Sequence, residues 1–195
     1  MGTLKYAILG MLYQKPRSGY EMAQEFQNTL NEFWSANHSQ IYPELKKLTR
    51  DGLAEYHVEI VGTVLEKKQY SITAKGREEF LQWMNSDLEL PPTPKSEFRL
   101  QMYFSSCLPE ERRLEMIAHQ LKLHQNRLEH LRNNQTKFTS IPSKDAPEFG
   151  DYLVLLHAIM REENNCEWLK QCIALCSRDS KETSDFPEKH QANDV

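Results

Sequence analysis

The chain has 195 residues, of which 39% are hydrophobic and 27% charged, enough apolar material for one large or two small folded domains. No apolar run reaches the roughly 20 residues that a membrane helix needs, and the apolar start, Met1–Tyr13, is followed by no small-residue cleavage site. We therefore expect a cytoplasmic protein with no membrane span. The formal net charge is −4, and residues 1–86 carry ten Lys and Arg against ten Asp and Glu. An argument for nucleic-acid binding must therefore rest on where the charges lie.

Residues 1–87 begin with three helical patterns. The first has apolar residues at helical spacing: Leu4, Ile8, Met11 and Leu12. The pattern breaks at Gln14–Arg17, and Ser18 followed three residues later by Glu21 forms a capping box that starts a second helix through Met22, Phe26 and Leu30. A third helix is predicted from near Ser39 through Ile41, Leu45 and Leu48, with Pro43 in its first turns and Gly52 ending it.

A hairpin and a fourth helix complete this first region. Leu53–Ile60 and Leu65–Ile72 have strand-like composition, and Val61–Thr63 makes a turn between them. Thr73 then caps a helix that carries Phe80, Leu81 and Met84. Three helices, a hairpin and a helix make up the plan of a winged helix-turn-helix domain, so we predict a mainly α protein with a DNA-binding domain over residues 1–87.

The proline-rich segment Leu88–Pro94 predicts an extended linker, and residues 93–176 read as a helical domain. One helix is expected over Thr93–Ser106, and two longer helices follow, each with apolar residues at heptad spacing. The apolar stripes on these two helices must be covered by other apolar surface. We therefore predict a homodimer in which a second copy covers them, and packing onto the first domain is the alternative. The predicted dimer residues are Leu114, Ile117, Leu121, Leu128, Leu155, Ile159, Leu169 and Ile173. The polar tail, residues 177–195, is predicted to be disordered.

The third helix and the hairpin supply the predicted DNA contacts. Polar residues near the start of a recognition helix reach base edges, and cations further along suit phosphates. These residues are Tyr20, Ser39, Gln40, Tyr42, Lys46, Lys47 and Arg50 on the helices, with Lys67, Lys68 and Tyr70 on the return strand of the hairpin. A solvated helix face and an edge strand protected by lysines are the alternative readings. A dimer presents two such units to a pseudo-palindromic operator in double-stranded DNA.

Enzymatic and metal-binding readings find little support. The chain has no GxSxG, no HExxH and no glycine-rich phosphate loop. Its four cysteines, Cys107, Cys166, Cys172 and Cys176, form no CxxC pair. We therefore predict that the protein is not an enzyme, has no cofactor and binds no metal, and that the cysteines pack as small apolar residues in a reducing compartment.

Four segments of the first domain form a distinctive set: LKYAILGML at Leu4–Leu12, SGYEM at Ser18–Met22, SQIYPELKKLTRDGL at Ser39–Leu53 and LEKKQYSITAKG at Leu65–Gly76. Together they resemble the PadR family of bacterial transcriptional regulators. The resemblance extends over about residues 1–176. FWSANHSQIYPELKKLT and FGDYLVL resemble the branch of the family that represses phenolic acid decarboxylase and other phenolic acid stress response genes. That likeness implies a repressor that p-coumaric, ferulic or caffeic acid releases from its operator.

A phenolic acid inducer needs an aromatic slot and a cation for its carboxylate. The candidates are Phe33, Trp34, His38, Tyr103, Tyr152, His157 and Arg161. A pocket between the two domains would let an inducer change the angle between the DNA-binding units. Core packing of the aromatic residues and a salt bridge of Arg161 are the alternatives. A regulator that responds to hydrophobic drugs, and a scaffold that does not bind DNA, remain as alternative functions.

Overall fold

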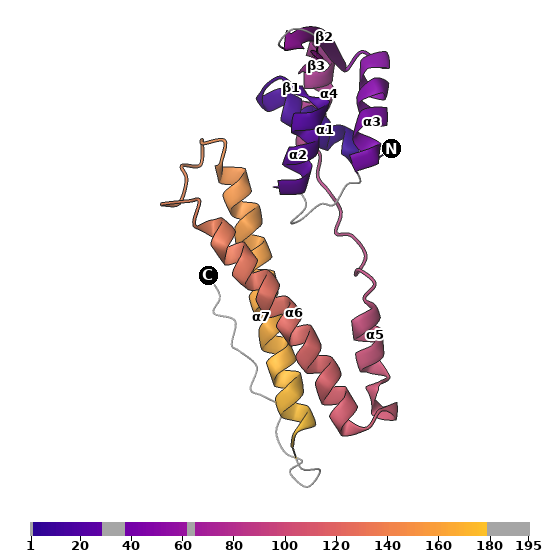
Figure 1. Ribbon diagram of the computed structural model, residues 1–195, viewed down its shortest axis with the longest axis vertical. Coiled ribbons are helices and arrows are strands. Elements are labelled where there is room, and N and C mark those ends of the chain that lie inside the picture. Colours follow the sequence, from indigo (N-terminus) through magenta and orange to yellow (C-terminus); the bar gives the residue numbers. More distant parts are fainter. Residues whose placement is uncertain (1, 29–37, 62–64, 179–195) are drawn as a thin grey trace. The chain divides into compact units, whose positions relative to one another are not determined.

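The computed structural model describes residues 2–28, 38–61 and 65–178 (Figure 1). The chain divides into two compact units, Met1–Thr93 and Pro94–Val195, at a point inside the proline-rich segment. Residues 87–96 have no regular secondary structure, as expected where three prolines remove backbone donors and restrict φ. Phe33, Trp34, Leu30 and the turn residues Gly62 and Thr63 lie outside the described residues.

The first unit contains helices packed on a small sheet and has the winged helix-turn-helix arrangement. Its elements are α1 (Leu4–Gln14), β1 (Arg17–Ser18), α2 (Gly19–Asn28), α3 (His38–Arg50), β2 (Ala54–Val61), β3 (Leu65–Ile72) and α4 (Ala74–Met84). The strand order is β1-β3-β2, and both neighbouring pairs are antiparallel. The short strand β1 was not predicted, because two residues carry no periodic signal and their pairing with Gln69 and Tyr70 is non-local.

Local signals set the helix ends. The Ser18–Glu21 capping box forms at the start of α2. Gly52 has φ 72°, and the N–H of Leu53 donates to the carbonyl of Leu48 at 2.9 Å, which together end α3 in a Schellman turn. The hydroxyl of Thr73 accepts from the N–H of Gly76 at 3.0 Å and caps α4. These three predictions are confirmed.

The apolar residues predicted for the first three helices form the core of this unit. Ile8, Leu9, Met22, Ile41 and Leu45 are each 0% exposed. Tyr70 of β3 joins the same cluster, whereas Leu81 and Met84 of α4 are exposed. The core therefore orients α3, because burying one face of this helix leaves its opposite face in solvent.

The second unit is helical. It comprises α5 (Glu97–Tyr103), a 3₁₀ turn (Ser105–Cys107), α6 (Glu110–Gln135) and α7 (Phe149–Cys176). The helix predicted over Thr93–Ser106 is shorter than expected, since Ser96 caps it by accepting from the N–H of Arg99 at 3.2 Å. The helices α6 and α7 run antiparallel, side by side (Figure 1). Among the described helices, none combines the length and the apolar character needed to cross a membrane.

Candidate nucleic-acid interface

The recognition helix α3 presents a polar face. Ile41, Leu45 and Leu48 are at most 1% exposed and fix the inner side of the helix. The predicted contact residues Ser39, Gln40, Tyr42, Lys46, Lys47 and Arg50 are all exposed. Acidic neighbours accompany two of the cations, because Lys47 Nζ lies 3.9 Å from Glu44 and Arg50 Nε lies 3.2 Å from Asp51. The helix therefore offers base-edge donors near its start and cations further along, in the order that the sequence predicts.

Tyr42 lies across the start of α2. A Cβ atom added to Gly19 would come within 2.6 Å of the Tyr42 ring, so only glycine permits this approach. Tyr42 keeps 48% of its surface exposed. Tyr20, the second residue of α2, is 63% exposed, and its hydroxyl accepts from the side-chain amide of Gln24 at 2.8 Å. Tyr20 and Tyr42 thus place two exposed phenol side chains at or beside the start of α2.

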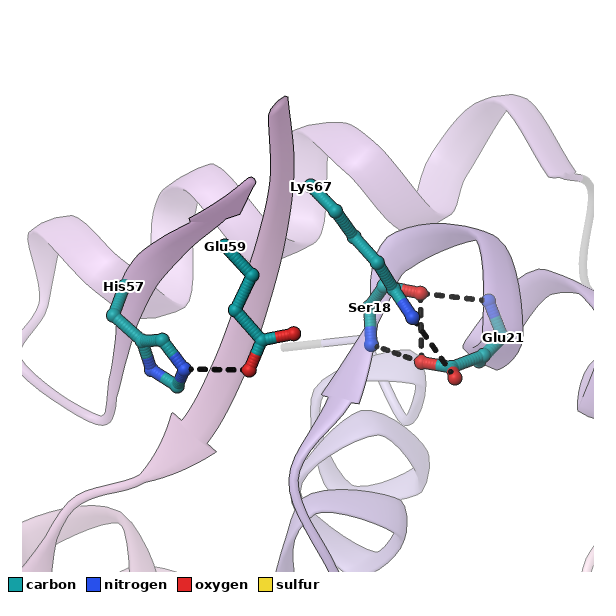
Figure 2. A network of polar contacts seen from close by, with 5 residues as sticks. All are labelled: Ser18, Glu21, His57, Glu59 and Lys67. Carbon is teal, nitrogen blue, oxygen red and sulfur yellow. Dashed lines mark hydrogen bonds and ion pairs between the residues drawn. The ribbon is translucent and has the colours of Figure 1, made fainter. Parts of the chain in front are cut away.

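A polar network joins the start of α2 to the hairpin (Figure 2). Glu21 Oε2 accepts from the backbone N–H and the hydroxyl of Ser18, both at 2.7 Å, and Glu21 Oε1 accepts from Lys67 Nζ at 3.1 Å. The hydrogen bonds from Ser18, together with the charge of Lys67, lower the pKa of Glu21 to about 2. Glu21 is therefore ionised at neutral pH and holds one of the two predicted wing lysines.

The hairpin β2–β3 is the wing, and its register sorts side chains onto two faces. Tyr56 opposes Tyr70 and Val58 opposes Lys68, while His57 opposes Gln69 and Glu59 opposes Lys67. Directly opposed residues share a face, so Lys67 and Lys68 point to opposite sides. On its side, Lys67 is accompanied by the His57–Glu59 pair, in which His57 Nε2 and Glu59 Oε1 lie 3.0 Å apart (Figure 2).

Tyr70 does not fit its predicted role as a DNA contact. It is only 7% exposed and packs in the core, and this burial raises the pKa of its phenol. Strand alternation turns it inward, a direction that the composition of the return strand does not reveal. The exposed tyrosine of this cross-strand pair is Tyr56, which is 43% exposed and carries Lys68 Nζ 4.3 Å from its ring centroid. Tyr56 is not among the contacts predicted from the sequence, because only the pairing of the two strands places it opposite Tyr70 and on the face of Lys68.

The candidate inducer residues lie in different parts of the chain. Tyr103 of α5 is 81% exposed, and Tyr152 of α7 packs edge-on against Phe138 at 5.4 Å. His157 and Arg161 are exposed, one turn apart on α7. For His38 only the backbone, at the start of α3, is described, and Phe33 and Trp34 lie outside the described residues. Among the described residues, no group of three or more His, Cys, Asp or Glu is arranged to hold a metal ion.

Arg161 has a buried partner. Its Nε and an Nη both lie 3.1 Å from Glu162 Oε1, and Glu162 Oε2 lies 2.5 Å from His124 Nδ1 of α6. Glu162 is 1% exposed. Burial opposes its ionisation, but the hydrogen bonds from His124 and Arg161 outweigh burial and lower its pKa. The salt-bridge alternative for Arg161 is therefore realised, with 40% of its side chain still exposed to solvent.

The heptad seams of α6 and α7 cover each other. Ile117, Leu155, Ile159 and Leu169 are at most 5% exposed within a single chain. Contrary to the prediction, these four residues therefore need no second copy to cover them, because two antiparallel helices bury one shared seam. Other large apolar residues of this unit remain exposed: Leu100, Tyr103, Phe104, Leu123, Leu153, Leu156, Met160 and Leu175.

Comparisons with known proteins agree with this architecture. Residues 8–82 match the model of the transcriptional regulator PadR-like family, and residues 94–177 match that of the virulence activator alpha C-terminal family. The chain is 42% identical over 182 residues to the negative transcriptional regulator PadR of Bacillus subtilis, which covers 92% of this chain and 100% of that protein.

Two solved structures of Bacillus subtilis PadR resemble the fold closely. One is a complex with operator DNA, with a TM-score of 0.86 at 41% identity, covering 90% of this chain and 99% of that one. The other is a complex with p-coumaric acid, with a TM-score of 0.82 at 38% identity and the same shares covered. These relatives are transcriptional regulators and not enzymes. With two domain models matched in order and a relative covered over its whole length, the chain belongs to the PadR-like family of transcriptional regulators.

Proposed function

We propose that this protein is a dimeric transcriptional repressor that binds operator DNA through α3 and the wing, and that a phenolic acid such as p-coumaric acid releases it. Its target genes are those of phenolic acid decarboxylation and the phenolic acid stress response, and it acts in the cytoplasm, where bacterial DNA lies. The observation that carries the proposal is the 42% identity to a negative transcriptional regulator over that protein's full length. The fold is also shared with structures of that relative bound to operator DNA and to p-coumaric acid.

The exposed face of α3 supports the DNA-binding part. Ser39 and Gln40 stand in the first turn with exposed side chains, where they can donate to and accept from base edges. Lys46 and Arg50 follow on exposed positions and suit phosphates. A chain of net charge −4 can bind DNA this way because its cations are grouped along one helix and the wing.

The inducer part rests on α7. His157 and Arg161 are four residues apart and therefore share a helix face, where they form a cationic and hydrogen-bonding pair for a carboxylate. Glu162 holds the Nε side of the Arg161 guanidinium, which leaves its remaining N–H groups for a ligand. Tyr103, Tyr152, His38, Phe33 and Trp34 remain candidates for the aromatic part of the site.

The dimer part rests on apolar surface that one chain leaves uncovered. Leu153, Leu156 and Met160 recur at helical spacing on α7 and are 48%, 36% and 59% exposed. We call these three residues the α7 stripe. A contiguous exposed apolar surface of this kind marks an interface, and a second copy provides two identical winged units for a pseudo-palindromic site.

Fluorescence anisotropy with a duplex from the gene's own control region tests the proposal. The purified protein should bind at fixed salt, and p-coumaric acid should release the DNA in a concentration-dependent way. The matched ligand control is p-coumaryl alcohol, which lacks the carboxylate and should release little DNA. Arg161→Met should bind DNA normally but respond weakly to the acid. Failure to bind any fragment of the control region refutes repression, whereas release only by bulky apolar drugs refutes the phenolic acid.

A further inference from the structure

Two adjacent lysines of the wing have different surroundings. Lys67 and Lys68 are consecutive on β3, so their side chains lie on opposite faces of the hairpin. From the sequence, both lysines are predicted to contact DNA as one basic cluster. The structure separates them, since each meets a different partner from a different element.

Lys67 is tied to the start of α2. Its ammonium lies 3.1 Å from Glu21 Oε1, and its side chain is 33% exposed (Figure 2). The other oxygen of Glu21 accepts from the backbone N–H and the hydroxyl of Ser18. One carboxylate thus connects the capping box of α2 to the wing, and the positive charge of Lys67 is neutralised within the protein.

Lys68 is exposed and lies on the same face of the hairpin as Tyr56 and Tyr70. Its ammonium stands 4.3 Å from the ring centroid of Tyr56, a cation–π contact that restricts a long side chain without neutralising its charge. The Tyr56 ring in turn packs on Tyr70 at 5.4 Å. Tyr42 of α3 lies close enough to Tyr70 to contribute to the raised pKa of that phenol. Tyr70 therefore lies near both Tyr56 of the wing and Tyr42 of the recognition helix.

We propose that the two wing lysines have different roles. Lys68, held on Tyr56, binds a DNA phosphate. Lys67 does not contact DNA and is a positioning residue that fixes the wing to α2 through Glu21. This inference rests on the proposed DNA binding. It assigns Tyr56 a new role, that of orienting the phosphate-binding cation. Lys67, which the sequence predicts to contact DNA, instead acts within the protein.

The salt dependence of operator binding distinguishes the two roles. Each phosphate neutralised contributes a slope of about −0.9 to log K against log salt concentration, so Lys68→Met should reduce the slope by about 2 in a dimer. Lys67→Met should leave the slope unchanged, because the bound complex keeps the same phosphate contacts. It should still weaken binding about fivefold, the size expected when each protomer loses one partly exposed ion pair. Lys122→Met, an exposed lysine of α6, is the matched control and should change neither quantity.

Substitutions at Glu21 test the positioning role. Glu21→Gln keeps an acceptor for Ser18 but removes the charge that holds Lys67. It should weaken binding as much as Lys67→Met does, and the double variant should be no weaker than either single one. Lys67→Arg, which preserves the ion pair, should bind like the parent protein. If Lys67 instead contacted phosphate, Glu21→Gln would strengthen binding by freeing the lysine.

Substitutions at Tyr56 test the orienting ring. Tyr56→Phe keeps the aromatic face and should retain the parent affinity, whereas Tyr56→Leu should weaken binding severalfold. Thermal melts must show that each variant is folded. A slope change for Lys67→Met equal to that for Lys68→Met, or stronger binding by Glu21→Gln, overturns the inference. Absence of DNA binding by the parent protein contradicts the proposed function instead, so the two failures are distinguishable.

Discussion

The two units of this chain bury apolar surface in different ways. The unit Met1–Thr93 encloses a core to which three helices and the sheet all contribute, with Ile8, Ile41 and Leu45 fully buried. The unit Pro94–Val195 has a narrow seam between two long helices and leaves the α7 stripe and Leu100 in solvent. We therefore expect the first unit to fold alone and the second to gain stability by associating with another copy. In a repressor built this way, one unit binds DNA and the other unit forms the dimer.

The largest effect is expected from the enclosed core. Leu45→Ala should lower the free energy of unfolding of the first unit by about 3 to 4 kcal/mol, because it removes a fully buried leucine beneath the recognition helix. Chemical denaturation followed by circular dichroism measures it. Met84→Ala, at a position that is 59% exposed, is the control and should cost only a few tenths of a kcal/mol. Equal losses for both variants would show that the core is not where the stability lies.

The seam of the second unit is expected to depend on its buried carboxylate. His124→Leu removes one partner of the buried Glu162 and leaves Arg161 as its hydrogen-bond partner, so it should destabilise this unit by about 2 kcal/mol. The double variant His124→Leu, Glu162→Leu removes the charge as well and should recover much of the loss. A double variant less stable than His124→Leu alone would contradict this account. Thermal unfolding at neutral pH provides the comparison.

The exposed stripe should matter for association rather than for folding. Leu153→Glu together with Met160→Glu should weaken the dimer at least tenfold, roughly 1.4 kcal/mol or more, since charges would replace apolar contacts. Analytical ultracentrifugation over a dilution series measures this. Gln125→Glu on α6 adds an exposed charge without removing an apolar side chain and serves as the control. An unchanged dimer in the stripe variant would assign the interface to other exposed apolar residues of the second unit.

The smallest expected effect is the acid response of the link between α2 and the wing. The pKa of Glu21 is about 2 in the folded protein against an ordinary 4.5, so its contribution to stability is complete above about pH 4.5 and is lost as the pH falls toward 2. Solvent screens a side chain that is 43% exposed, so this contribution should stay below about 1 kcal/mol. Glu21→Gln should flatten the stability profile between these pH values. A profile that is as steep in this variant would assign the acid response to other carboxylates.

Local patterns predicted most of the elements and part of the candidate site. The capping box at Ser18, the end of α3 at Gly52 and the cap at Thr73 involve residues within a few positions of one another, so the sequence contains each complete motif. The exposed face of α3 follows from its own apolar spacing. The resemblance to the PadR family, which indicated the fold and the function, also rests on contiguous motifs.

Other features depend on contacts between distant residues. The strand β1, the inward direction of Tyr70 and the separation of Lys67 from Lys68 follow from strand register, which pairs residues across the hairpin and across the domain. Likewise, two heptad patterns do not reveal whether they face each other or a second chain.

The sequence by itself determined where α2 and α4 begin and where α3 ends, which residues of α3 face outward and to which family the chain belongs, because each depends on residues that are neighbours in the sequence. Only the tertiary structure decided that α6 and α7 pack along one apolar seam that contains the Glu162–His124 pair. It also decided that Lys67 forms an ion pair with Glu21, whereas Lys68 does not. The physical reason is that the residues that bury a side chain or neutralise its charge can lie far from it in the sequence. Several residues could serve as such partners, and only the packing of the folded chain determines which of them does.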